Sequence, residues 1–130
     1  MKRPAPKKTT VEVTAVVPGS ATAAVQFALA QVGDSYVWGA SGPNAWDCSG
    51  LTQAAMRRVG VSLPHQSGAQ GRAGRAISRS QLRPGDLVVW SGHVALSLGG
   101  DKIVHAANPR VGVVVGKIYG SPIGYRRIVG

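Results

Sequence analysis

The hydrophobic pattern of the chain changes its period about halfway along. From Ala21 to Val32, small and apolar residues recur at helical spacing, with Ser20 placed to cap this helix and Gly33 placed to end it. A second helical pattern begins near Cys48 and ends at Gly60. The pattern predicts that the first helix buries one face formed by Val25, Leu29 and Val32.

After Ser80 short apolar runs alternate with turns, which is typical of strands. The predicted strands are Leu87–Trp90, His93–Leu98, Lys102–Ala106, Val111–Tyr119 and Ile123–Val129. Gly33–Ala45 is predicted to be a loop, and the polar, glycine-rich segment His65–Arg79 has room for a short helix. Helices followed by strands indicate an α+β fold, in which N-terminal helices pack on a mostly antiparallel sheet of five to six strands.

The length of 130 residues corresponds to one small domain. Residues 1–19 are predicted to be a basic, proline-containing arm or linker, and residues 20–130 the folded domain. The chain has no 18-residue apolar run, so we expect no transmembrane segment. The apolar stretch Val11–Val17 is too short and too polar for a signal peptide.

The net charge of +10, from 15 basic and five acidic residues, favours anionic partners. No aromatic-rich basic stripe or nucleic-acid motif accompanies the charge, so we expect no binding to nucleic acid. The arginines between the two halves of the chain fit two interpretations, a solvated basic face or contacts to substrate carboxylates. They are Arg72, Arg75, Arg79 and Arg83.

Cys48 is the only cysteine, which excludes an internal disulfide and a cysteine-rich zinc site. A free cysteine is most often an inert core residue. Here it lies at a predicted helix start, where unpaired N–H groups and the helix dipole favour a reactive thiolate. The preceding Asp47 is predicted to cap the helix and not to take part in catalysis, because a carboxylate beside the thiol raises the pKa of the thiol.

Two histidines downstream provide a candidate base. If Gly99–Asp101 forms a three-residue hairpin loop, His105 opposes Ala95, and the two histidines share one sheet face about 5–8 Å apart. A two-residue loop would put them on opposite faces. On one face beside Cys48 they would form a triad, in which His93 takes the thiol proton and His105 orients the ring of His93.

Two other interpretations of these polar residues remain open. Cys48, His93, His105 and Asp47 could in principle hold zinc, but the sequence has no short-spaced ligand pair, so we expect no metal and no cofactor. His65 is either a substrate contact at the rim of a cleft or an ordinary loop histidine.

Five short motifs follow one another between Ala21 and Val129. They are Tyr36-Val37-Trp38-Gly39, Asp47-Cys48-Ser49-Gly50, Leu82-Arg83-Pro84-Gly85-Asp86-Leu87, Gly92-His93-Val94-Ala95-Leu96 and Ile103-Val104-His105-Ala106. Together with the separation of 45 residues from Cys48 to His93 and 12 from His93 to His105, they resemble the NlpC/P60 family of papain-like cell-wall peptidases. Within that family the chain is most similar to the actinobacterial Rip-type peptidoglycan endopeptidases.

The resemblance implies a papain-like fold and cleavage of peptidoglycan stem peptides, typically between D-γ-glutamyl (or its amide) and meso-diaminopimelate. By motif position it implies that Cys48 is the nucleophile, His93 the base and His105 the third polar residue. It also implies that Tyr36 lines the site and helps to hold the oxyanion. Ser49 would lie near the substrate, with its backbone N–H as an oxyanion donor.

The resemblance further implies a monomer that acts on peptidoglycan, outside the cell or in the cell wall. Two alternatives stay open from the sequence. One is a non-catalytic wall-binding module, and the other is a papain-like amidase or acyltransferase that acts on a different substrate.

Overall fold

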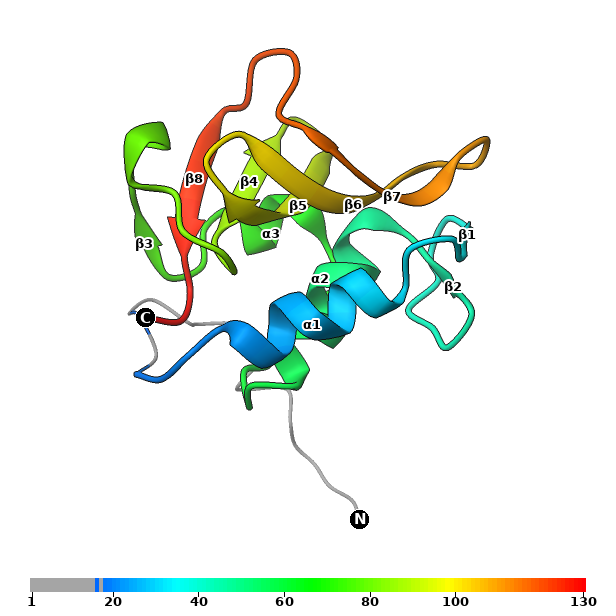
Figure 1. Cartoon of the computed structure of the whole chain (residues 1–130), viewed down its shortest axis with the longest axis horizontal. Coiled ribbons are helices and arrows are strands. Elements are labelled where there is room, and N and C mark those ends of the chain that lie inside the picture. Colours follow the sequence, from blue (N-terminus) through cyan, green and yellow to red (C-terminus); the bar gives the residue numbers. More distant parts are fainter. Residues whose placement is uncertain (1–15, 17) are drawn as a thin grey trace.

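Two helices cover one face of a six-stranded sheet, as Figure 1 shows. The computed structural model describes residues 16 and 18–130, so most of the predicted N-terminal arm, residues 1–19, lies outside the described residues. The helices are α1 (Thr22–Ala30) and α2 (Cys48–Arg57), and a short α3 (Ser67–Gln70) follows further along the chain.

The sheet has the strand order β3-β8-β4-β5-β6-β7, and every neighbouring pair is antiparallel. Its strands are β3 (Arg75–Ala76), β4 (Leu87–Trp90), β5 (His93–Gly99), β6 (Lys102–Asn108), β7 (Gly112–Lys117) and β8 (Gly124–Arg127). The α+β prediction is therefore confirmed. The sequence predicted β4 with its observed bounds, misplaced the ends of the other long strands by one or two residues, and missed the two-residue β3.

The segment Gly33–Ala45, predicted to be a loop, contains β1 (Ser35–Tyr36), which pairs in parallel with β2 (Ala45–Trp46). Such short strands carry no alternating pattern that a sequence could show. From the sequence, all three tryptophans are predicted to lie in the core or in the wall of a cleft. Trp46 and Trp90 are buried, but Trp38, in the turn after β1, is 84% exposed.

The prediction for the buried face of α1 is wrong. Ala24 and Ala28 are fully buried against the core, whereas Leu29 is 40% and Val32 is 45% exposed. Two alanines one turn apart let the backbone of α1 lie close to α2 and the sheet, a contact that larger side chains would prevent. Hydrophobicity alone favours burial of the face that carries Leu29 and Val32. The small side chains of Ala24 and Ala28 decide instead which face of α1 is buried.

The C-terminal end of α2 follows the prediction. The N–H of Gly60 donates to the carbonyl of Arg57 at 3.1 Å, and the N–H of Val61 donates to the carbonyl of Met56 at 3.0 Å. This pair of bonds is the Schellman motif, and Gly60 has the positive φ of +82° that the motif requires. The helix therefore stops where glycine allows the chain to turn.

The loop predicted for the β5–β6 hairpin is also wrong, yet the predicted register holds. Leu96 pairs with Val104 as the prediction requires, but Gly99 pairs with Lys102, so only Gly100 and Asp101 form the loop. By itself, a two-residue loop would turn the two histidines to opposite faces.

A β-bulge restores the predicted register. Leu98 is the extra residue on β5, and the register shifts between Ser97 and Gly99. The hydroxyl of the buried Ser97 accepts a hydrogen bond from the N–H of Gly99 at 2.9 Å, which fixes the bulge. The short loop and the bulge together have the same effect as the predicted three-residue loop, so His93 and His105 share one face.

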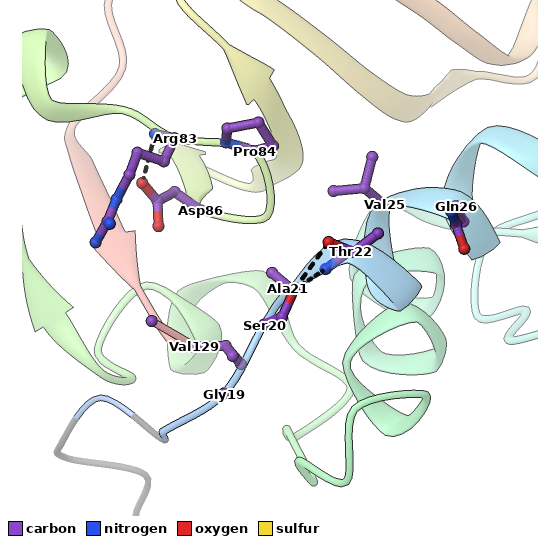
Figure 2. A pocket seen from close by; sticks show the side chains of 11 residues that line it. Gly19, Ser20, Ala21, Thr22, Val25, Gln26, Arg83, Pro84, Asp86 and Val129 are labelled. Carbon is purple, nitrogen blue, oxygen red and sulfur yellow. Dashed lines mark hydrogen bonds between the residues drawn. The ribbon is translucent and has the colours of Figure 1, made fainter.

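A buried ion pair joins the turn before β4 to β8. Arg127 donates through Nε to Oδ1 of Asp86 at 3.0 Å and through Nη2 to Oδ2 at 2.8 Å. Oδ2 also accepts from the backbone N–H of Arg83 at 2.8 Å, as Figure 2 shows. Asp86 in the Arg83–Asp86 turn is therefore a structural residue.

Replacing Asp86 with alanine is expected to lower the free energy of unfolding by about 3–5 kcal/mol, because Arg127 would keep a buried charge without its partner. Urea denaturation followed by circular dichroism measures this loss. Asp101→Ala is the matched control, since Asp101 is exposed at the hairpin tip and should change stability by less than about 0.5 kcal/mol. Equal unfolding midpoints for the two variants would contradict the structural role.

Candidate active site

Cys48 is the first residue of α2 and is 8% exposed. Burial raises the pKa of its thiol most strongly, and the charge of Asp47 raises it further. The backbone N–H groups of Val94, Ser49 and Cys48 itself lower this pKa, but the balance leaves the pKa raised. The resting site therefore holds a neutral thiol that needs a base.

Asp47 caps α2, as predicted, and both of its carboxylate oxygens are engaged. Oδ1 accepts from the N–H of Gly50 at 2.7 Å and lies 2.8 Å from Nε2 of His65. Oδ2 accepts from the N–H of Gly39 at 2.8 Å. Asp47 thus ties the segment after β1 and the segment before α3 to the helix start that carries Cys48.

The two histidines form a hydrogen-bonded pair. Nε2 of His93, on β5, lies 2.8 Å from Nδ1 of His105, on β6. Burial lowers the pKa of His93, and burial together with the neighbouring His93 lowers the pKa of His105 to about 4. Both rings are therefore neutral near pH 7. If Nε2 of His93 carries the hydrogen of this bond, Nδ1 of His93 has a free lone pair and can accept a proton.

Two aromatic residues cover the histidine pair. Trp90 lies with its ring centroid 5.4 Å from that of His93, and Tyr119 lies 6.1 Å from His105. The two aromatic rings stack at 4.8 Å, and Nε1 of Trp90 donates to the carbonyl of Tyr119 at 2.8 Å. Burial, and then the charge of Cys48, raises the pKa of Tyr119. From the sequence pattern, Tyr119 was expected only to end a strand.

The predicted oxyanion residues lie near Cys48. Tyr36 pairs with Trp46, two residues before Cys48, in the β1–β2 ladder. Burial raises the pKa of Tyr36, and the charges of Cys48 and Asp47 raise it further. Ser49 is buried beside the nucleophile. Within the described residues, neither the N–H of Cys48 nor that of Ser49 donates to a protein oxygen, so both can bind a developing negative charge. Among the described residues, the side chain of His65 is hydrogen-bonded to Asp47 and to no other group.

Gln70 is a fully buried residue of the site that the sequence pattern did not identify. Its Nε2 donates to the carbonyl of Ser49 at 2.9 Å and to that of Pro64 at 2.8 Å, and its Oε1 accepts from the hydroxyl of Thr52. These bonds fix the first turn of α2 against the segment that carries His65. The contacts to α2 join residues about 20 positions apart, so no local pattern in the sequence reveals them.

Gly50 leaves no room for a side chain. A Cβ at this position would collide with the carbonyl oxygen of Ala40 and would come within 3.1 Å of Nε2 of His65. We expect Gly50→Ala to lower the free energy of unfolding by about 1–3 kcal/mol and to reduce activity, because the start of α2 must shift. Gly116→Ala is the control, since a Cβ added at Gly116 would meet no atom within 4 Å. Thermal denaturation of the two variants decides the prediction, and equal melting temperatures would contradict it.

No group of three or more His, Cys, Asp or Glu residues that could hold a metal ion occurs within the described part of the chain. A hollow of about 450 Å³ lies at a different place, between the start of α1 and the turn before β4 (Figure 2). The prediction that Ser20 caps the first helix is wrong, because α1 begins at Thr22 and its N-cap is Ala21. The hydroxyl of Ser20 still accepts from the N–H of Thr22 at 3.1 Å. None of the three predicted triad residues lines this hollow.

The fold and the site together define a papain-like class of protein, with a cysteine at the start of α2 and a hydrogen-bonded histidine pair on β5 and β6, two neighbouring strands that contact α2. The model of the NlpC/P60 family matches residues 33–128. The chain therefore belongs to the NlpC/P60 family.

Similar proteins include probable endopeptidases and peptidoglycan hydrolases from bacteria. The chain is 39% identical over 100 residues to a probable endopeptidase of Mycobacterium tuberculosis, with 75% of this chain and 26% of that protein covered. It is 45% identical over 89 residues to a probable endopeptidase of Corynebacterium glutamicum, with 66% of this chain and 43% of that protein covered. The chain thus spans between a quarter and a half of the length of these relatives.

Solved structures show the same fold. The NlpC/p60 domain of the peptidoglycan hydrolase SagA superposes with a TM-score of 0.78 at 34% identity, over 85% of this chain and 100% of that one. The peptidoglycan hydrolase RipB from Mycobacterium tuberculosis gives a TM-score of 0.77 at 29% identity, over 85% of this chain and 65% of that one. The predicted likeness to Rip-type proteins is confirmed. Among the described residues, no helix has the length and hydrophobicity needed to cross a membrane.

Proposed function

We propose that the chain is a cysteine peptidase that cleaves peptidoglycan stem peptides between D-γ-glutamyl (or its amide) and meso-diaminopimelate. The observation that carries the proposal is the hydrogen-bonded pair His93–His105 on β5 and β6, two neighbouring strands that contact the helix beginning at Cys48. The relatives named endopeptidases and peptidoglycan hydrolases support the substrate class.

In the first half of the reaction, Nδ1 of His93 takes the thiol proton while the sulfur of Cys48 attacks the carbonyl carbon of the peptide bond. The N–H groups of Cys48 and Ser49, with the phenol of Tyr36, stabilise the oxyanion of the tetrahedral intermediate. The intermediate collapses to a thioester. The C–N bond breaks, and the amine of diaminopimelate leaves with the proton from His93.

In the second half, His93 removes a proton from water as the water oxygen attacks the thioester carbon. The C–S bond breaks, the glutamyl carboxylic acid is released, and the proton returns to Cys48. His105 holds the ring of His93 through its Nδ1 during both halves. The chemistry needs only water and the residues of this site.

We place the activity in the cell wall or outside the cell, where peptidoglycan is found, and we propose that the chain acts as a monomer. The exposed basic surface favours binding to an acidic polymer. His65 is proposed to stiffen the substrate cleft through Asp47, with which it shares one hydrogen bond.

Mass spectrometry of the soluble products released from meso-diaminopimelate-type peptidoglycan tests the proposal. Wild type should release fragments that begin with diaminopimelate, and Cys48→Ala should release none. Fragments cut at another amide would indicate an amidase or a different endopeptidase. Binding to the insoluble polymer with no release by wild type would indicate a wall-binding module.

A further inference from the structure

A cavity of about 630 Å³ lies between α3, β4 and the start of β8, and the triad does not use it. Its walls combine basic and apolar side chains. They include Arg72, Ile77, Val89, Ile123 and Arg126.

The cavity begins one strand away from the nucleophile. Val89 in its wall is the direct partner of Val94 in the β4–β5 ladder, and β5 contacts α2, the helix that begins at Cys48. Paired residues on neighbouring antiparallel strands have Cα atoms about 4.5–5.5 Å apart. A peptide bound across Cys48 can therefore reach this cavity.

The walls of the cavity come from segments that also build the site. Gly68 lines the cavity from α3, the helix whose Gln70 holds the carbonyl of Ser49. Ile123 donates its N–H to the carbonyl of Val89 at 2.7 Å and follows Tyr119 by four residues. The cavity and the catalytic residues are therefore parts of one rigid framework.

One guanidinium in the cavity is held in place before any ligand binds. Nε of Arg126 donates to the carbonyl of Ala73 at 2.8 Å, and Nη2 donates to those of Gly74 at 3.2 Å and Arg72 at 3.4 Å. Among the described residues, Nη1 of Arg126 and the guanidinium of Arg72 donate to no protein acceptor.

Within the part of the chain that the structure describes, neither of these two arginines forms an ion pair with a carboxylate. The described residues that line the cavity include no Asp or Glu. Asp47 and Asp86 are each bonded elsewhere, to His65 and to Arg127 respectively. The cavity is therefore a positively charged site with an apolar wall, and it fits an anionic group carried on an aliphatic chain.

We propose that this cavity is a subsite for a carboxylate of the peptide substrate. Arg72 and Arg126 bind the carboxylate, and the aliphatic part of the same residue packs on Val89 and Ile123. Ile123 is 71% exposed, and this contact would cover it. The inference rests on the proposed function, because diaminopimelate supplies such a carboxylate at the end of an aliphatic chain.

Calorimetric titration of the Cys48→Ala protein tests the subsite without turnover. The two probes are the tripeptide L-Ala-γ-D-Glu-meso-diaminopimelate and its analogue with the diaminopimelate carboxylates amidated. We expect the free acid to bind about tenfold more tightly than the amide, and Arg72→Gln to remove this preference. Arg110→Gln is the matched control, because Arg110 is an exposed arginine in the β6–β7 turn, and it should keep the preference.

Equal affinities for the two peptides, no binding of either one, or an unchanged preference in Arg72→Gln would each overturn the subsite. Arg126→Lys is a second variant that keeps the charge but loses part of the carbonyl contacts, and it should weaken the preference. Cleavage by wild type is scored separately. Cleavage by wild type without a binding preference for the free acid would retain the proposed function and reject the subsite. Binding that prefers the free acid, without cleavage, would retain the subsite and reject the proposed function.

Discussion

Replacing Cys48 with alanine should lower kcat/KM on peptidoglycan by about 10⁴-fold or more, because the covalent route needs the sulfur. In the free energy of the transition state this is a loss of at least about 5.5 kcal/mol. His93 would then have no thiol to deprotonate, and water would have to attack the peptide bond directly. Release of soluble fragments by equal amounts of wild type and variant, measured over time, gives the ratio.

The loss of activity must come without loss of fold. Cys48 contributes one small side chain to the core, and the cap of α2 depends on Asp47 and Gly50, which the variant keeps. The melting temperature should therefore change little. Cys48→Ser is a second control, since it keeps the shape of the side chain but offers a poor nucleophile. Substantial cleavage by either variant would reject the nucleophile.

The three residues of the proposed triad could be selected from the sequence because each lies at a position with a readable local pattern. Cys48 precedes a helical period, and His93 and His105 lie on neighbouring predicted strands. The register that joins the histidines is predicted correctly through a wrong loop, because the bulge at Leu98 offsets the missing loop residue. Facing positions in a hairpin are therefore easier to predict than the turn that connects them.

The supporting residues could not be predicted in the same way. Gln70 contacts Ser49 across 21 positions, and Trp90 contacts Tyr119 across 29. Such bonds follow from how α3 and the segment after β7 pack once the chain has folded, and neither segment has a pattern that indicates its partner. The prediction for the face of α1 failed for a related reason, since close packing against α2 decides which side chains are buried.

Asp47 shows how the site depends on these tertiary contacts. Its carboxylate caps α2 and holds both Gly39 and His65, so it joins three segments at the nucleophile. Its negative charge also raises the pKa of Cys48. The residue therefore makes the resting thiol less acidic while it fixes the position of that thiol, and this increases the importance of the base.

Replacing His93 with alanine should lower kcat/KM by about as much as the loss of Cys48, since the thiol has a raised pKa and no other base faces it in the proposed mechanism. His105→Ala should cost less, about 10–100-fold, because His105 orients the base and does not transfer the proton itself. Kinetics on a soluble stem peptide separate the two variants. Equal losses would show that His105 has a direct part in proton transfer.

The pH dependence of wild type distinguishes a base from a merely structural histidine. Only the neutral ring of His93 can accept the thiol proton, so kcat/KM should rise as pH rises through the pKa of His93. Burial lowers this pKa below its ordinary value of 6.5, and the acid limb should therefore have its midpoint below pH 6.5. A midpoint above pH 6.5 would contradict the lowered pKa of His93 and the mechanism that uses its neutral ring as the base.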